Sequence, residues 1–109
     1  MVVIKKSDWI KFKAVKKQAL EKFCTNALAE FEATIHDESL SKHERYLKLY
    51  SSVQETDKKL GQIFNGLSRS RASWQMMMIR AEGLVEDEAL EEMSEAFREQ
   101  STQIRWEDN

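Results

Sequence analysis

Residues 41–84 read SKHERYLKLYSSVQETDKKLGQIFNGLSRSRASWQMMMIRAEGL, and this stretch determines how the rest of the chain is organised. Uncharged side chains recur along it at alternating steps of three and four residues, the heptad spacing of a helix with one buried stripe. The stripe consists of Tyr46, Leu49, Val53, Thr56, Leu60, Ile63, Leu67, Ser70, Trp74, Met77, Ala81 and Leu84. We therefore predict a long central helix here.

The dipeptide Asn65-Gly66 is the main argument against a continuous helix, because such a pair often marks a turn or a helix end. A turn would normally shift the helical phase, yet Leu67 and Trp74 stay in register with Leu60. We therefore favour one continuous helix and keep two collinear helices as the alternative.

The composition of the chain predicts an all-α fold. The 109 residues include no proline and only three glycines, so few positions can stop a helix. Residues 1–109 show no repeat or linker and are predicted to form a single helical domain. We expect a small helical bundle built on the long central helix, flanked by an N-terminal and a C-terminal helix.

The N-terminal helix is predicted over residues 7–36, with Ser7 as its N-cap. It carries a wide apolar ridge, which consists of Phe12, Val15, Ala19, Phe23, Ala27, Phe31 and Ile35 with Leu20, Cys24 and Leu28 beside it. Ser41 and Glu44 form a capping box that starts the next helix. The short connection makes the two helices antiparallel neighbours.

The C-terminal helix is predicted to begin at about Glu86, after Gly83 has ended the central helix, and to run to about Arg105. Its inward side chains should be Ala89, Leu90, Met93, Ala96, Phe97, Gln100 and Ile104. It is expected to fold back on the far half of the central helix.

This arrangement leaves part of the heptad stripe uncovered, so we predict a homodimer in which two central helices pack together. The sequence does not indicate whether they run parallel or antiparallel. The candidate dimer seam consists of Leu49, Val53, Leu60, Ile63, Leu67, Trp74 and Met77. Met76, Met77 and Met78 are interpreted as core or interface residues rather than as a ligand groove.

The charges are segregated along the chain. Residues 1–22 hold seven lysines and two acids, a net charge of +5, whereas residues 82–109 hold ten acids and two arginines, a net charge of −8. The two ends could face one another, could both be solvated, or could leave the acidic helix as a docking surface for a basic partner. The candidate acidic docking face consists of Glu88, Glu91, Glu92, Glu95 and Glu99.

Residues 58–80 form a basic stretch with five lysines and arginines and no acid. Lysine and arginine neutralise phosphates, so nucleic-acid binding is the alternative function. Five cations spread over 23 residues do not make one dense patch, however, and the net charge of the chain is −2.

The sequence offers no motif for catalysis, a metal or another cofactor. It lacks the repeated Glu-x-x-His pairs of helical metal sites, and Gly61 and Gly66 form no phosphate-binding loop. A single cysteine, Cys24, cannot close an internal disulfide. No segment is apolar over the length of a signal peptide or a membrane span. We therefore expect a cytoplasmic, non-enzymatic protein–protein interaction module with no membrane association.

Overall fold

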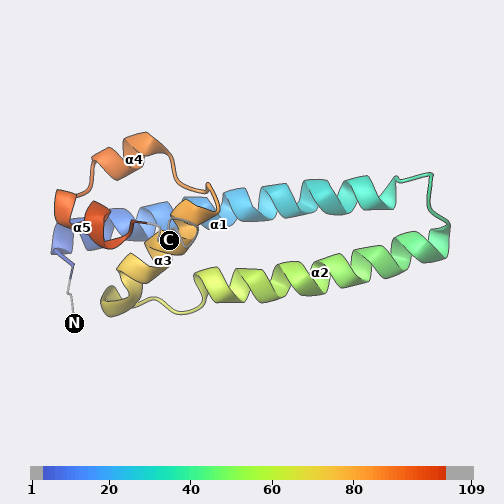
Figure 1. The fold of residues 1–109 in the computed structure, drawn as a ribbon, viewed down its shortest axis with the longest axis horizontal. Coiled ribbons are helices and arrows are strands. Elements are labelled where there is room, and N and C mark those ends of the chain that lie inside the picture. The colour runs from blue at the N-terminus through green and yellow to red at the C-terminus, as the bar shows by residue number, and fades with distance from the viewer. Residues whose placement is uncertain (1–3, 103–109) are drawn as a thin grey trace, which may run out of the picture.

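The structure is a computed structural model that describes residues 4–102. The first two elements are the helices α1 (Lys6–Ile35) and α2 (Lys42–Phe64). They form an antiparallel hairpin that runs the length of the molecule (Figure 1). The described residues contain helices and no strand, which confirms the all-α prediction.

The turn at the tip of the hairpin is fixed by the predicted capping box. The Ser41 backbone N–H donates to Glu44 Oε1 at 2.8 Å, and the Glu44 N–H donates to Ser41 Oγ at 3.1 Å. Arg45 then reaches back and donates to the carbonyl oxygens of Leu40 and Ile35, each at 3.1 Å. These bonds satisfy backbone groups that the end of α1 and the start of α2 leave without helical partners.

The prediction of a continuous central helix is wrong, because α2 ends at Phe64. Asn65 is extended and Gly66 has a φ of 76°, a left-handed conformation that glycine adopts at little cost. The Gln75 side-chain amide donates to the carbonyl oxygens of Asn65 (2.9 Å) and Gly66 (3.2 Å) and so holds this loop. Lys16 also donates to the carbonyl oxygen of Gly66.

After this loop the chain reverses through a short 3-10 helix, η1 (Arg69–Arg71), into α3 (Ala72–Ala81), which lies against α1 and is not collinear with α2 (Figure 1). The reversal buries Met76 and Ile79 in the core of the monomer. A straight continuation of α2 would have carried both residues away from that core. Gly83 has a φ of 68° and follows the end of α3, as predicted.

The single C-terminal helix predicted from Glu86 to Arg105 is also wrong. The structure has two short helices, α4 (Asp87–Glu91) and α5 (Glu95–Gln100). Ser94 separates them, because its hydroxyl accepts the N–H of Phe97 at 3.2 Å and caps α5. Both helices lie at the N-terminal end of α1 (Figure 1). α5 packs against α3, so the C-terminal segment does fold back on the far part of the predicted central helix. Ile104 and Arg105 lie outside the described residues.

The N-cap of α1 is Lys5 rather than Ser7, so the helix begins one residue earlier than predicted. The first turn contains Asp8, which is 2 % exposed and accepts two hydrogen bonds from Ser94, from the backbone N–H at 2.8 Å and from the hydroxyl at 2.5 Å. An acid in the first turn is favourable for the helix dipole. Asp8 therefore serves both α1 and the connection to α5.

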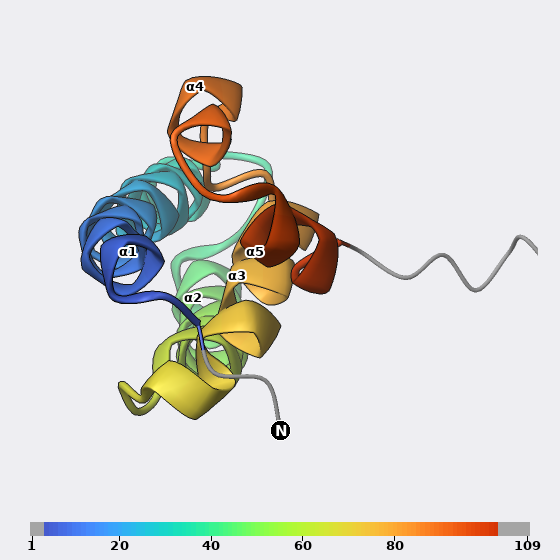
Figure 2. The same ribbon diagram turned by 90° about the vertical axis from the view of Figure 1, so that its left-hand side faces the viewer.

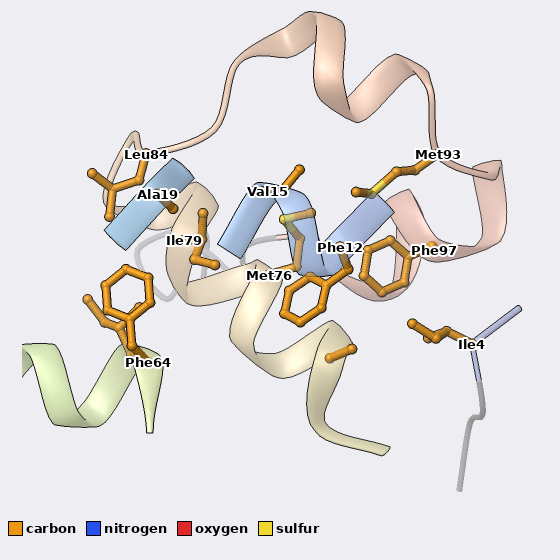
Figure 3. Packing of buried hydrophobic residues seen from close by; sticks show 12 residues of the cluster. Ile4, Phe12, Val15, Ala19, Phe64, Met76, Ile79, Leu84, Met93 and Phe97 are labelled. Atoms are coloured by element: carbon orange, nitrogen blue, oxygen red, sulfur yellow. The ribbon is translucent and has the colours of Figure 1, made fainter. Parts of the chain in front are cut away.

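The hydrophobic core lies where α3, α4 and α5 meet the N-terminal half of α1 (Figure 3). Phe12 is fully buried at its centre and meets the ring of Phe97 edge to face, with ring centroids 6.2 Å apart. Phe23 and Phe64 form a similar pair at 5.8 Å. The buried apolar residues are Ile4, Phe12, Val15, Ala19, Ile63, Phe64, Ala72, Met76, Ile79, Leu84, Met93 and Phe97.

Candidate protein-interaction surface

The half of the hairpin nearest its tip has no third layer. Among described residues 20–35, only Thr34 is buried, and in α2 the buried residues are Ile63 and Phe64 at its C-terminal end. Figure 1 shows α3, α4 and α5 gathered over the other half. The radius of gyration is 17.0 Å, whereas a compact domain of this length would have about 13 Å. The tip half is therefore a two-helix structure with little core of its own.

One side of the hairpin is polar along its groove. Asn26 and Glu30 of α1 and Lys59 of α2 line a cavity of about 220 Å³ there. Lys48 and Ser52 line a second hollow on the same side, nearer the tip. Figure 2, which looks along the hairpin, shows α3 to α5 on one side of it. Glu82 and Leu84, which follow α3, also line the first cavity. The polar groove therefore lies on the side of the hairpin that carries α3.

The opposite side of the hairpin carries apolar side chains on both helices. Successive residues are turned by about 100° around a helix, so Phe31 and Ile35 lie about 100 to 140° from Glu30. On α2, Ser52 marks the polar side, and Val53 and Tyr46 are turned from it by about 100 to 120° around the helix axis. Because the two helices are antiparallel, equal rotations away from the polar groove bring the apolar residues of α1 and those of α2 to the same side of the hairpin. We call it the open flank, which consists of Ile10, Lys13, Lys17, Cys24, Leu28, Phe31 and Ile35 of α1 with Tyr46, Leu49, Tyr50 and Val53 of α2. Leu20 and Leu60, at its edge, are half-buried and pack against the core.

The open flank holds most of the exposed apolar surface. Nine large apolar side chains of the described residues are exposed, and six of them lie on this flank. Leu28 (65 %), Tyr46 (66 %) and Tyr50 (58 %) are the most exposed of the six, and the others are Ile10, Ile35 and Val53. Exposed apolar residues scattered singly need no explanation, but several on one face of a hairpin make that face a candidate interaction surface.

The residues predicted for the dimer seam are divided by the break after α2. Leu49 and Val53 lie on the open flank, but Leu60 packs against the core and Ile63 is buried in it. Leu67 is exposed in the connecting loop, Trp74 is exposed on α3, and Met77 is half-buried there. The structure therefore brings two of the seven together on the open flank, and a seam through all seven on one helix is wrong.

The acidic residues of the predicted docking face are exposed, but they lie on α4 and α5 and between them rather than on one helix: Glu88, Glu91, Glu92, Glu95 and Glu99. The segment that carries them lies beside the lysine-rich start of α1 (Figure 1). Lys22 pairs with Glu86 at 3.3 Å, and Lys11 donates to the carbonyl oxygen of Glu92. These contacts support the interpretation in which the two charged ends of the chain face one another.

The basic stretch 58–80 does not form one surface. Lys59 pairs with Glu82 at 2.7 Å, and Arg80 donates to the Arg98 carbonyl at 2.9 Å and to Ser101 Oγ at 3.1 Å. Arg69 donates to the carbonyl oxygen of Ile4 at 2.6 Å. Three of the five cations are thus bonded within the chain.

Comparisons of the chain with protein families, with curated proteins and with solved structures found no match. Among residues 4–102, no three histidine, cysteine, aspartate or glutamate side chains are grouped to hold a metal ion. Within the same residues, every helix is too short or too polar to cross a lipid bilayer. The open flank is therefore the candidate functional site.

The contribution of α1 to this site was missed by sequence reasoning. We interpreted the whole apolar ridge of the first helix as core, including Leu28 and Ile35. The available signal was the width of that ridge, since Leu20, Cys24 and Leu28 form a second row beside the first. Two apolar rows indicate two neighbours, and in the half of the hairpin nearest its tip α2 is the only helix beside α1 (Figure 1).

Proposed function

We propose that this protein acts by binding, without catalysing a reaction, as a protein–protein interaction module that forms a homodimer through the open flank. The observation that carries the proposal is the row of exposed apolar side chains on a two-helix segment with no third layer. Helices gain most of their stability in proteins from packing of an apolar face, which this segment lacks on one side. We also propose a cytoplasmic location, because a chain with a single cysteine cannot use internal disulfides.

The expected affinity follows from the exposed area. Complete burial of a large apolar side chain stabilises by about 1.5 to 3 kcal/mol, so a half-exposed one contributes about 1 kcal/mol more when covered. Six such residues on each of two copies give about 12 kcal/mol. Association costs at least about 4 kcal/mol, which leaves a net of at most about 8 kcal/mol. We therefore expect a weak dimer, with a dissociation constant no lower than the micromolar range.

The test is the mass in solution, measured by light scattering and sedimentation over a concentration series. The wild-type chain has a mass of 12.8 kDa and should approach twice that value as concentration rises. Tyr50→Glu should remain monomeric, because it places a charge in the interface. Ser51→Glu is the matched control: it adds the same charge at an exposed neighbouring position that points away from the flank, and should leave dimerisation unchanged.

Circular dichroism of both variants separates loss of association from loss of folding. Both positions are exposed in the monomer, so both variants should keep the wild-type helix content. A wild-type chain that stays monomeric at every concentration would overturn the proposal. So would a Tyr50→Glu variant that dimerises as well as the wild type.

A second candidate function is the binding of nucleic-acid phosphates. Lys16 lies close to Arg71, and burial together with the charge of Arg71 lowers the pKa of Lys16. Two neighbouring cations of this kind would be stabilised by a phosphate. Binding of single-stranded RNA that weakens steeply with salt, and that is lost in Arg71→Glu, would support this function; absence of binding at low salt would exclude it.

A further inference from the structure

We propose that a single-stranded nucleic acid binds through its phosphates along the N-terminal half of α1, on a cationic face that α1 and η1 form together. This cationic face consists of Lys6, Lys13, Lys16, Lys17, Arg69 and Arg71. The inference rests on the second candidate function, which it extends from one pair of cations to a surface, and it does not depend on the homodimer. It is carried by the placement of the six cations and by the position of the acidic segment on the other side of α1.

Four lysines of α1 share one side of the helix. At about 100° per residue, Lys6 is turned from Lys13 by about 20°, and Lys17 is turned from Lys13 by about 40°. Lys16 lies about 60° from Lys13 in the opposite sense, at the edge where its Nζ donates to the carbonyl oxygen of Gly66. Lys16 is half-buried and the other three are exposed. The row from Lys6 to Lys17 is about 16 Å long.

The 3-10 helix η1 adds two exposed arginines beside this row. Arg69 donates to the carbonyl oxygen of Ile4 at 2.6 Å, which places it next to the start of α1. Burial and the charge of Arg71 lower the pKa of Lys16, so these two cations are neighbours. Their like charges oppose each other, and a phosphate bound between them would reduce the repulsion. The surface therefore combines α1 with η1, although the basic stretch 58–80 forms no surface by itself.

The acidic segment leaves the cationic face uncovered. Lys11 donates to the carbonyl oxygen of Glu92, and Lys22 pairs with Glu86 at 3.3 Å. Lys11 and Lys22 are turned from Lys13 by about 160 and 180° around α1. Figure 2 shows α4 above α1 and the loop that leads into α3 below it. The acids of the C-terminal segment are therefore paired with the lysines on the opposite side of α1.

The acids of α1 do not neutralise the cationic face. Asp8 is buried and accepts hydrogen bonds from Ser94, on the side of the acidic segment. Glu21 follows Lys17 by about one helical turn, toward the tip of the hairpin. Residues 58–80, which include both arginines of η1, contain no acid. Counting Glu21 at its edge, the face has a net charge of +5.

A flexible polyanion suits this face better than a duplex or a lipid bilayer does. The six cations lie on two elements and not in one line, so a single strand can follow them, whereas a DNA duplex is stiff over about 50 nm. A helix that lies in a membrane interface has a full apolar side. Among residues 4–19, Ile10 is the only large apolar side chain that is exposed. The phosphates of a single strand are therefore the ligand that the face suits.

The experiment measures binding of fluorescently labelled oligouridine to the full-length chain by anisotropy, over a range of salt concentrations. For a single strand, each phosphate contact contributes about −0.7 to the slope of log K against log salt concentration. Contacts from about four of the six cations would give a slope of about −3. A fourfold rise in salt concentration should then weaken binding about fiftyfold.

Two double variants with the same net charge test where the strand binds. Lys13→Gln with Lys17→Gln removes two cations from the cationic face and should reduce the slope by about half. Lys11→Gln with Lys22→Gln removes two cations from the opposite side of α1 and should leave the slope unchanged. All four lysines are exposed, so both double variants should keep the wild-type helix content in circular dichroism.

The outcomes separate this inference from the earlier proposals. Equal slopes for the two double variants would overturn the cationic face, and loss of binding in Arg71→Glu would still support the second candidate function. Absence of oligouridine binding at low salt would overturn both. Tighter binding of the duplex with oligoadenosine would overturn the choice of a single strand, and so would binding to phosphatidylserine vesicles without binding to oligouridine. Tyr50→Glu, which should be monomeric, should keep the wild-type slope, so the result does not depend on whether the chain dimerises.

Discussion

The contact between Asp8 and Ser94 makes a quantitative prediction about what holds the C-terminal segment on α1. Asp8 accepts both the backbone N–H and the hydroxyl of Ser94, at 2.8 and 2.5 Å, and is almost completely buried. A hydrogen bond to a charged group contributes about 1.5 to 3 kcal/mol, and removal of the acceptor leaves buried donors unsatisfied. We expect Asp8→Ala to lower the free energy of unfolding by about 3 kcal/mol.

Such a loss is large for a domain whose whole stability is about 5 to 15 kcal/mol. With a urea dependence of about 1.5 kcal/mol per molar, the unfolding midpoint should fall by about 2 M. Asp8→Asn should lose about half as much, because its single carbonyl oxygen can still accept one of the two hydrogen bonds. Urea unfolding followed by circular dichroism and by tryptophan fluorescence measures both.

Each single substitution also changes something else, so a double-mutant cycle is needed. Asp8→Ala removes an acid from the first turn of α1, and Ser94→Ala removes the cap of α5, each worth about 1 kcal/mol. The cycle cancels these contributions and should leave a coupling of about 2 kcal/mol between the two residues. A coupling below about 0.5 kcal/mol would refute the reasoning, because the two side chains would then not be bonded in solution.

The remaining predictions concern helix ends and the core, and urea unfolding tests them all. Gly83→Ala should destabilise by about 1 to 2 kcal/mol, because φ is 68° there. Gly61→Ala within α2 should stabilise by up to about 1 kcal/mol if the Asn65 side chain, 3.2 Å from the new methyl, moves aside. Equal effects of the two substitutions would contradict both assignments. Ser41→Ala should cost about 1 kcal/mol through loss of the capping box. The hydrogen bonds from the Ser41 backbone N–H and hydroxyl group lower the pKa of Glu44. The contribution of Glu44 to the free energy of unfolding is therefore present above its unfolded pKa and is lost as pH falls through the lower folded value. Glu44→Gln should remove this acid sensitivity. Phe97→Ala should cost about 3 to 5 kcal/mol, and a loss under 1 kcal/mol would show that α5 is not part of the core.

Features that depend on nearby residues could be predicted from the sequence. The capping box requires only Ser41 and Glu44, three residues apart, and the structure contains both of its hydrogen bonds. The end of α3 at Gly83 is local in the same sense, since a glycine in the left-handed conformation ends the helix whatever packs around it.

The break after Phe64 could not be predicted in this way. The heptad spacing remains regular across Asn65 and Gly66, but the loop is held by side chains distant in sequence, Gln75 and Lys16. The reversal is favoured by burial of Met76 and Ile79 against α1, an effect that no local pattern records. The division of the C-terminal helix has a similar cause, because the acceptor that fixes Ser94 is 86 residues away.

The open flank was partly predictable. Apolar spacing correctly indicated that Leu49 and Val53 share a face, but the face on α1 was assigned to the core because the sequence does not show which half of a helix the other elements cover. That information comes from the packing of α3 to α5 at one end of the hairpin.

The uneven thickness of the molecule has a consequence for how its amide protons exchange with solvent. Amides in helices around Phe12 and Ile79 should exchange only through global unfolding, because breaking their hydrogen bonds disrupts the core. Amides between about residues 28 and 50 should exchange through local opening of the hairpin tip, at a lower free energy. If the copies associate, the protection of the tip amides from exchange should rise with protein concentration. The protection of the core amides should change only as much as association changes the global free energy of unfolding. A hydrogen-exchange map of the free chain would thus distinguish the part of the fold that has a core from the thinner hairpin tip.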